Sequence, residues 1–230
     1  MHRIMLSENR IDINRIRLFQ KILPRWYDHH GRKFPWRKTT TTKYQYVIAE
    51  VLLQRTRAET IAFFFPNFIR DYPSWKRLSH ATPEQLQCYL QPIGLWRRRA
   101  SSIHLLATEM AQRNGKFPLE RKEIESLPGV GQYIANSILL FCHGEPQPLL
   151  DTNMARVLER VFGPRKKADI RYDSNLQKLA LDIVTCEMPK KMNWAILDLA
   201  AIICIIKKPH CDICPLNAIC EWNKKKNKLQ

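Results

Sequence analysis

The sequence predicts an all-α protein, and three observations lead to this prediction. Glycine is scarce, with 7 in a chain of 230 residues. Apolar residues recur at the spacing of one helix face, for example over residues 48–52 and again over residues 138–141. Prolines such as Pro66 and Pro83 fall between the apolar stretches or at their starts, where they mark helix boundaries. We therefore expect many short helices.

Several helix starts can be placed from local chemistry. Thr82 followed by Pro83 has the pattern of an N-cap and a first turn, and residues 39–42 form a threonine-rich linker. Asp151 precedes a stretch whose apolar side is formed by Met154, Val157, Leu158 and Val161. Asp151 thus lies at a helix start, and on local grounds alone a capping role is favoured over catalysis.

A glycine-rich turn stands between two apolar helical patterns. It contains Leu127, Gly129, Val130 and Gly131, so a helix must end, turn tightly and restart there. Backbone N–H groups beside a helix start suit a phosphate oxygen, and the glycines allow a DNA backbone to come close. Taken alone, the turn also fits an ordinary helix–helix connection.

The charge balance favours a polyanionic partner. The chain has 38 Lys and Arg against 21 Asp and Glu, a formal net charge of +17. Such an excess is typical of nucleic-acid binding, although a solvated basic surface or a membrane face also fits. Residues 97–99 are three consecutive arginines, with phosphate contacts or plain solvation as the alternatives, and a basic run at 224–228 adds phosphate attraction or is merely solvated.

Targeting and redox features predict a soluble, intracellular protein, here cytoplasmic and nucleoid-associated. Residues 1–18 mix charged with apolar side chains and lack the apolar core of a signal peptide, and no segment has the length of a membrane span. Seven cysteines in a reducing compartment do not suggest a disulfide framework. We expect Cys88, Cys142 and Cys186 to be small core residues.

The other four cysteines carry the strongest chemical signal in the chain. Cys204, Cys211, Cys214 and Cys220 have the spacing C-x6-C-x2-C-x5-C. Four thiolates in one tight loop suit zinc or a [4Fe–4S] cluster, and the spacing alone does not separate the two. Metal coordination is preferred over four unrelated buried cysteines.

Three motifs together resemble the endonuclease III superfamily of helix-hairpin-helix DNA glycosylases. They are LPGVGQYIA at 127–135, LLDTNMARVLER at 149–160 and the cysteine loop, and the similarity covers roughly residues 30 to 222. The resemblance implies a two-lobed helical fold with a C-terminal [4Fe–4S] cluster loop. One lobe would be a helical barrel over 44–148 that holds the hairpin, and the other would combine 1–43 with 149–230.

The resemblance also implies roles for individual residues. Asp151 matches the catalytic aspartate, which reverses the local preference for a simple cap, and Glu50 matches the acid that adenine mismatch glycosylases use to protonate a purine. Tyr133 stands where bifunctional members have a lysine, so a Schiff base is excluded and a monofunctional enzyme with weak or no lyase activity is expected. The remaining matches are DNA-contacting positions: Gln54, Arg55, Leu127, Gly129, Val130, Gly131, Lys207 and Lys208.

The substrate expected from the resemblance is thymine or uracil opposite guanine in double-stranded DNA, reached by base flipping. Tyr133 favours this substrate, as does the absence from this sequence of the further C-terminal domain found in adenine mismatch enzymes. The first alternative is removal of adenine opposite guanine or 8-oxoguanine, and the second is a non-catalytic iron–sulfur DNA-binding module. We expect a monomer, and a functional association with a DNA methyltransferase system stays open.

Overall fold

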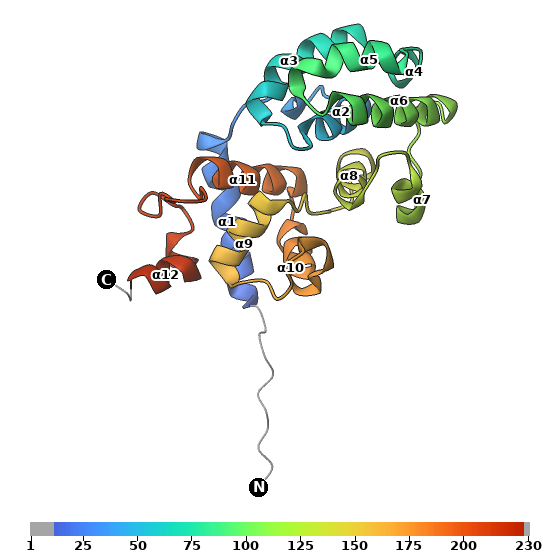
Figure 1. Ribbon diagram of the computed structural model, residues 1–230. Helices are drawn as coiled ribbons and strands as arrows, with labels where there is room; N and C mark the ends of the chain where they lie inside the picture. Colours follow the sequence, from blue (N-terminus) through green and yellow to red (C-terminus); the bar gives the residue numbers. More distant parts are fainter. Residues whose placement is uncertain (1–11, 228–230) are drawn as a thin grey trace. The chain divides into compact units, whose positions relative to one another are not determined.

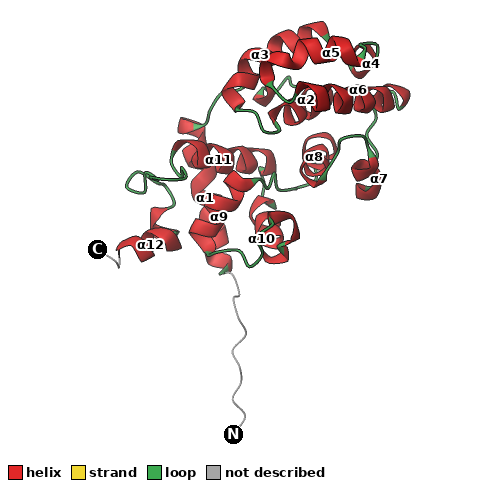
Figure 2. Cartoon of the chain, in the orientation of Figure 1, coloured by secondary structure: helices red, strands yellow, loops and turns green. Residues whose placement is uncertain are grey.

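The computed structural model describes residues 12–227, and the regular structure within them is helical throughout, with no strand (Figure 2). The all-α prediction is therefore confirmed. Residues 1–11 and 228–230 lie outside the described part, and with them most of the N-terminal segment 1–18 and the end of the basic run at 224–228. None of the helices between residues 12 and 227 has the length and apolar character needed to cross a bilayer.

The chain divides into two compact units. The first joins the described parts of Met1–Gly31 and Pro148–Gln230, so it is built from both ends of the chain, and the second is Arg32–Gln147. The lobe boundaries expected from the resemblance, 44–148 against 1–43 with 149–230, stay a prediction.

The first unit is a group of helices around α1 and α11 (Figure 1). Helix α1 packs against α10 and α11, and α9 packs against α10, α11 and α12. The predicted apolar side of α9 is buried, from Met154 to Val161. The elements are α1 (Ile13–His30), α9 (Thr152–Phe162), η4 (Ile170–Tyr172), α10 (Ser174–Val184), α11 (Pro189–Ile202), η5 (Asn217–Ile219) and α12 (Glu221–Asn227).

The second unit is built around α2, which is buried without interruption from Tyr46 to Leu52. Helix α2 packs against α3 and α8, and α6 packs along α4 and α5 (Figure 1). The elements are η1 (Pro35–Arg37), α2 (Lys43–Leu53), α3 (Ala58–Asp71), α4 (Trp75–Ser79), α5 (Pro83–Leu90), η2 (Gln91–Ile93), α6 (Trp96–Gln112), α7 (Arg121–Ser126), α8 (Gln132–Ile138) and the π-helical turn η3 (Leu139–His143).

Two helices of this unit begin with a capping box. Thr82 accepts a hydrogen bond from the Gln85 backbone while the Gln85 side chain accepts from the Thr82 backbone, and Thr42 and Gln45 repeat the arrangement at the start of α2. Each such cap stabilises a helix by about 1 kcal/mol. The predicted start at Thr82 and Pro83 is confirmed, and the linker over residues 39–42 ends in a cap.

Two expectations from the sequence are wrong. Pro66 lies inside α3, not at a boundary. The ring removes one backbone donor, and burial of Ile61, Phe65 and Phe68 on the same helix offsets that loss. Cys88 is exposed, because the buried face of α5 is formed by Leu86 and Leu90. Cys142 is buried as expected, and Cys186 is partly buried.

Candidate functional site

The glycine-rich turn connects α7 to α8, as the sequence predicts. Leu127 and Val130 are 4% and 7% exposed, so their side chains anchor the turn from within the second unit. Gly129 has φ +73°, and a Cβ there would lie 3.0 Å from Cβ of Ser102 on α6. Gly131 is exposed and extended, with no atom within 4 Å of a Cβ built on it. Gly129 is exposed as well, so the accessible part of the turn is its backbone at Gly129 and Gly131.

Helices α2 and α8 bring two predicted site residues together. The Tyr133 hydroxyl donates a hydrogen bond to Oε2 of Glu50 at 3.1 Å. Glu50 is only 5% exposed, and a carboxyl group so deeply buried needs polar partners to offset its lost hydration. Tyr133 is half-buried, so this pair joins the buried acid to the more accessible start of α8.

Gln54 and Arg55 lie in the turn that follows α2, and both side chains are exposed. Arg55 adopts the left-handed conformation, with φ 57°. A second turn, before α6, has the same feature at Leu95, with φ 52° and 51% of its surface exposed. Each turn thus exposes one long side chain, Arg55 in the first and Leu95 in the second, on a backbone conformation that non-glycine residues seldom adopt.

The arginine run 97–99 is not one phosphate-binding cluster. Arg97 and Arg98 are exposed, and the Arg97 guanidinium lies 3.9 Å from the ring centroid of Trp96. Arg99 is 6% exposed and points into the second unit, so a phosphate contact by Arg99 is excluded. The apolar period of α6 explains why: Arg99 shares a buried face with Ile103, Leu106 and Met110.

Asp151 is the N-cap of α9 in the first unit. Its Oδ1 accepts hydrogen bonds from the backbone N–H of Asn153 at 2.9 Å and of Met154 at 2.8 Å, and its Oδ2 accepts from the Asn153 side chain at 2.7 Å. The segment that leads into Asp151 is held by a hydrogen bond from the Leu149 N–H to the buried Asn193 side chain on α11, at 2.7 Å. The carboxylate is therefore fixed in direction while it stays partly exposed.

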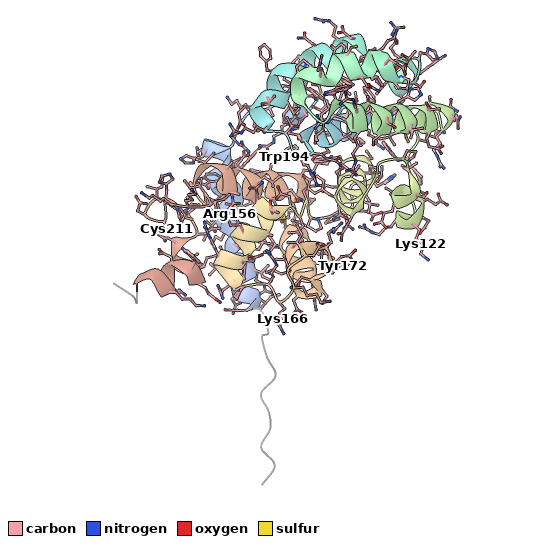
Figure 3. All side chains as sticks on the ribbon, in the orientation of Figure 1. Lys122, Arg156, Lys166, Tyr172, Trp194 and Cys211 are labelled. Carbon is pink, nitrogen blue, oxygen red and sulfur yellow. The ribbon has the colours of Figure 1, made fainter. Side chains whose placement is uncertain are left out.

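The four cysteines lie between α11 and the start of α12, and α9 holds this loop with two arginines. Figure 3 labels Arg156 on α9 and Cys211 in the loop. Arg156 donates to the Cys204 carbonyl at 2.9 Å, and Arg160 donates to the carbonyls of Ile205 and Ile206 at 2.7 Å each. Arg160 also lies 3.3 Å from Sγ of Cys204.

The thiols influence one another electrostatically. The pKa of the Cys214 thiol is raised to about 11, mainly by burial; the charges of Cys204, Cys220 and Cys211 contribute to the rise, and a backbone hydrogen bond at Leu216 opposes it. Burial also raises the pKa of Cys220. Within residues 12–227, however, no three His, Cys, Asp or Glu side chains converge in a geometry that holds a metal ion. The donors are gathered in one loop, and Lys207 and Lys208 are exposed on it.

Sequence reasoning missed the residues that hold these sites in place. Asn193 and the two α9 arginines act across long sequence separations, and nothing in their local pattern predicts their partners. Arg99 had a signal, because residues 99, 103, 106 and 110 follow helical spacing and identify a buried face.

Known proteins resemble this chain over most of its length. A family model described as HhH-GPD superfamily base excision DNA repair protein matches residues 48–181. A thymine/uracil-DNA glycosylase of Pyrobaculum aerophilum is 37% identical over 217 residues, which cover 92% of this chain and 94% of that protein. An adenine DNA glycosylase of Buchnera aphidicola is 29% identical over 214 residues, covering 92% of this chain and 61% of that protein.

A solved structure described as that of a thermostable thymine-DNA glycosylase superposes with a TM-score of 0.84 at 28% identity, covering 92% of this chain and 98% of that one. The resemblance inferred from the hairpin, the Asp151 segment and the cysteine loop is confirmed. The chain belongs to the HhH-GPD superfamily of base excision DNA repair proteins.

Proposed function

We propose that this protein is a monofunctional DNA N-glycosylase that removes thymine or uracil mispaired with guanine. The observation that carries the proposal is the Tyr133–Glu50 hydrogen bond. It places the phenol of Tyr133, at the start of α8, beside the buried carboxyl group of Glu50, where an amine would be needed for a Schiff base. The similarity to a thymine/uracil-DNA glycosylase over nine-tenths of both chains supports the same substrate class.

Asp151 is the proposed catalytic carboxylate. Breaking the bond between the base and the sugar leaves positive charge on the sugar, which a fixed carboxylate stabilises until water adds at the same carbon. The departing base carries the bonding electrons away and takes up a proton. Three hydrogen bonds orient the Asp151 oxygens before substrate arrives, so little reorganisation is needed during the reaction.

Glu50 and Tyr133 are proposed to act on the extruded base. Glu50 can supply a proton, and the Tyr133 hydroxyl, which donates to Glu50, fixes the direction of its carboxyl group. A phenol forms no imine with the sugar, so the abasic strand should stay intact until alkali is added.

Duplex DNA is the proposed partner, held at several backbone positions. The open space around Gly131 admits a phosphate, and the exposed Gln54, Arg55, Lys207 and Lys208 supply polar and cationic contacts. The buried side chains of Leu127 and Val130 would contribute indirectly, by fixing the position of the turn. The net charge of +17 gives a long-range attraction to the same partner.

A [4Fe–4S] cluster is proposed to bind Cys204, Cys211, Cys214 and Cys220. Four cysteine thiolates are the donor set such a cluster requires, and the electrostatic effect of the other three thiols on Cys214 fits a shared site. When bound, the cluster would cross-link the loop and thereby fix Lys207 and Lys208, while Arg160 beside the Cys204 sulfur offsets negative charge.

The test is a set of duplexes that contain one T·G, U·G, A·G, A·8-oxoguanine or oxidised-pyrimidine pair, scored for strand cutting with and without alkali. We expect alkali-dependent cutting at T and U opposite G. Cutting only at adenine would favour the alternative substrate, adenine opposite guanine or 8-oxoguanine, with which the buried acid Glu50 is also consistent. Cutting without alkali would refute the monofunctional assignment, and DNA binding without base release would favour a binding module.

A further inference from the structure

Arg99 is a cationic side chain buried at the start of α6. Its exposure is 6%, whereas Arg97 and Arg98 before it are exposed. A buried guanidinium must replace the water it has lost with hydrogen-bond partners. Those partners lie in two segments far apart in the sequence: the Gln54 loop, residues 54–57 between α2 and α3, and the Gly94 loop, residues 91–95 between α5 and α6.

The two terminal nitrogens of Arg99 divide between the loops. Nη1 donates to the carbonyls of Ile93 at 3.1 Å and Gly94 at 2.6 Å. Nη2 donates to the Gln54 carbonyl at 2.8 Å and to Oγ1 of Thr56 at 2.9 Å. The planar, forked guanidinium is suited to such bridging, which the single ammonium of a lysine cannot reproduce.

Thr56 forms a second connection between the same loops. Its hydroxyl accepts from Arg99 and donates to the Ile93 carbonyl at 3.4 Å. The guanidinium, the hydroxyl and the three carbonyls thus form one network. Breaking it at either side chain should loosen both loops together.

Each loop also holds a non-glycine residue in the left-handed conformation. Arg55 in the Gln54 loop and Leu95 in the Gly94 loop have φ 57° and 52°, and Asn114 is the one other such residue in the described part of the chain. Backbone strain of this kind persists where the surroundings over-determine it. The network around Arg99 supplies that constraint next to two exposed side chains.

We propose that Arg99 is a positioning residue that fixes the Gln54 and Gly94 loops to each other, so that their exposed side chains meet the duplex at one set spacing. The inference rests on the proposed function for its DNA partner. The rigid pair of loops would lower the entropy lost when the duplex is distorted to expose a base. Without the network, the loops would have to be ordered during that step.

The test uses Thr56→Val and Arg99→Lys, with Arg113→Lys at the other end of α6 as the matched control. Thr56→Val keeps the side-chain shape and removes both of its hydrogen bonds. The first measurement needs no DNA: amide hydrogen exchange of peptides that contain residues 54–57 and 91–95 in the whole protein. Both variants should speed exchange in both loops, and Arg113→Lys should leave both unchanged.

The second measurement is fluorescence of 2-aminopurine placed beside a T·G pair, together with single-turnover base release. We expect Thr56→Val to lower the fluorescence rise and to slow base release roughly tenfold, the effect of one charge-assisted hydrogen bond, with a smaller change in duplex affinity.

The proposal is overturned if Thr56→Val speeds exchange in one loop alone or in neither. It is also overturned if both loops loosen while 2-aminopurine fluorescence and affinity match the wild type. If the wild type releases no base from any duplex, the proposed activity fails, and the exchange and 2-aminopurine data still judge the role of Arg99. A melting curve of Thr56→Val that matches the wild type shows that the loosened loops do not result from misfolding.

Discussion

Gly129 and Gly131, the two glycines of the turn between α7 and α8, should differ in how much stability an alanine substitution costs. At Gly129, φ is +73° and a new Cβ would lie 3.0 Å from Cβ of Ser102. A left-handed alanine costs about 1–2 kcal/mol, so Gly129→Ala should lower the melting temperature by roughly 2–8 °C for a chain of this size. At Gly131 the backbone is extended and the space is open, so an alanine fits without strain. Gly131 is also the N-cap of α8, where glycine is preferred over alanine, and this loss offsets the entropic gain, so Gly131→Ala should change stability by less than about 1 kcal/mol.

The alanine substitution at Gly131 should weaken DNA binding. The added methyl group would occupy the space in which a phosphate is proposed to approach the start of α8. Loss of one backbone hydrogen bond to a charged oxygen costs about 1.5–3 kcal/mol, which is roughly 10- to 150-fold in Kd. Gly131→Ala should therefore keep nearly its full stability and bind DNA less tightly.

The assay pairs thermal melting of each variant with fluorescence anisotropy on a T·G duplex at fixed salt, because phosphate contacts weaken steeply as salt rises. Unchanged affinity in Gly131→Ala would refute the hairpin as a phosphate contact. A Gly131→Ala variant that is destabilised more than Gly129→Ala would refute the open space around Gly131, and an unaffected Gly129→Ala would refute the strain assigned to Gly129.

Three further substitutions test the chemistry. Asp151→Asn should keep the helix cap and most of the stability, because Asn and Asp cap equally well, yet slow single-turnover base release at least 100-fold; release at the wild-type rate would exclude Asp151 as the catalytic carboxylate. Tyr133→Lys should introduce alkali-independent strand cutting and a borohydride-trapped adduct with DNA, and the lack of any adduct would place Tyr133 away from the sugar. Cys214→Ser should lower iron and sulfide content and the melting temperature of protein purified without oxygen, and unchanged iron content would exclude Cys214 as a ligand.

Local patterns predicted the parts of the site that depend on neighbours in the sequence. The cap at Thr82, the turn at Gly129 and the helix start at Asp151 each follow from residues within a few positions of one another. The Tyr133–Glu50 bond was not predictable in this way, since it joins residues 83 positions apart through packing of α2 on α8. Both residues were predicted as site residues by resemblance, and the structure adds the contact between them.

Charge was the pattern that misled. Three consecutive arginines read as one basic surface, but a helix turns by about 100° per residue, so neighbours in a run face different directions. Arg97 and Arg98 remain in solvent, and Arg99 falls on the face that α6 buries. The helical spacing of the apolar residues that follow predicts better whether a charged side chain at a helix start is exposed or buried.

Capping and catalysis are not competing roles for Asp151. The first turn of α9 offers two backbone N–H groups, which hold the Asp151 carboxylate at a set position. A carboxylate that stabilises a developing positive charge must be oriented before the reaction, and the cap provides this orientation. Asp151→Glu tests this point: the extra methylene keeps the charge but moves it away from the N–H groups. We expect it to lose base release nearly as fully as Asp151→Asn while also losing about 1 kcal/mol of stability, whereas retained activity would mean that the charge alone, without the cap geometry, is sufficient.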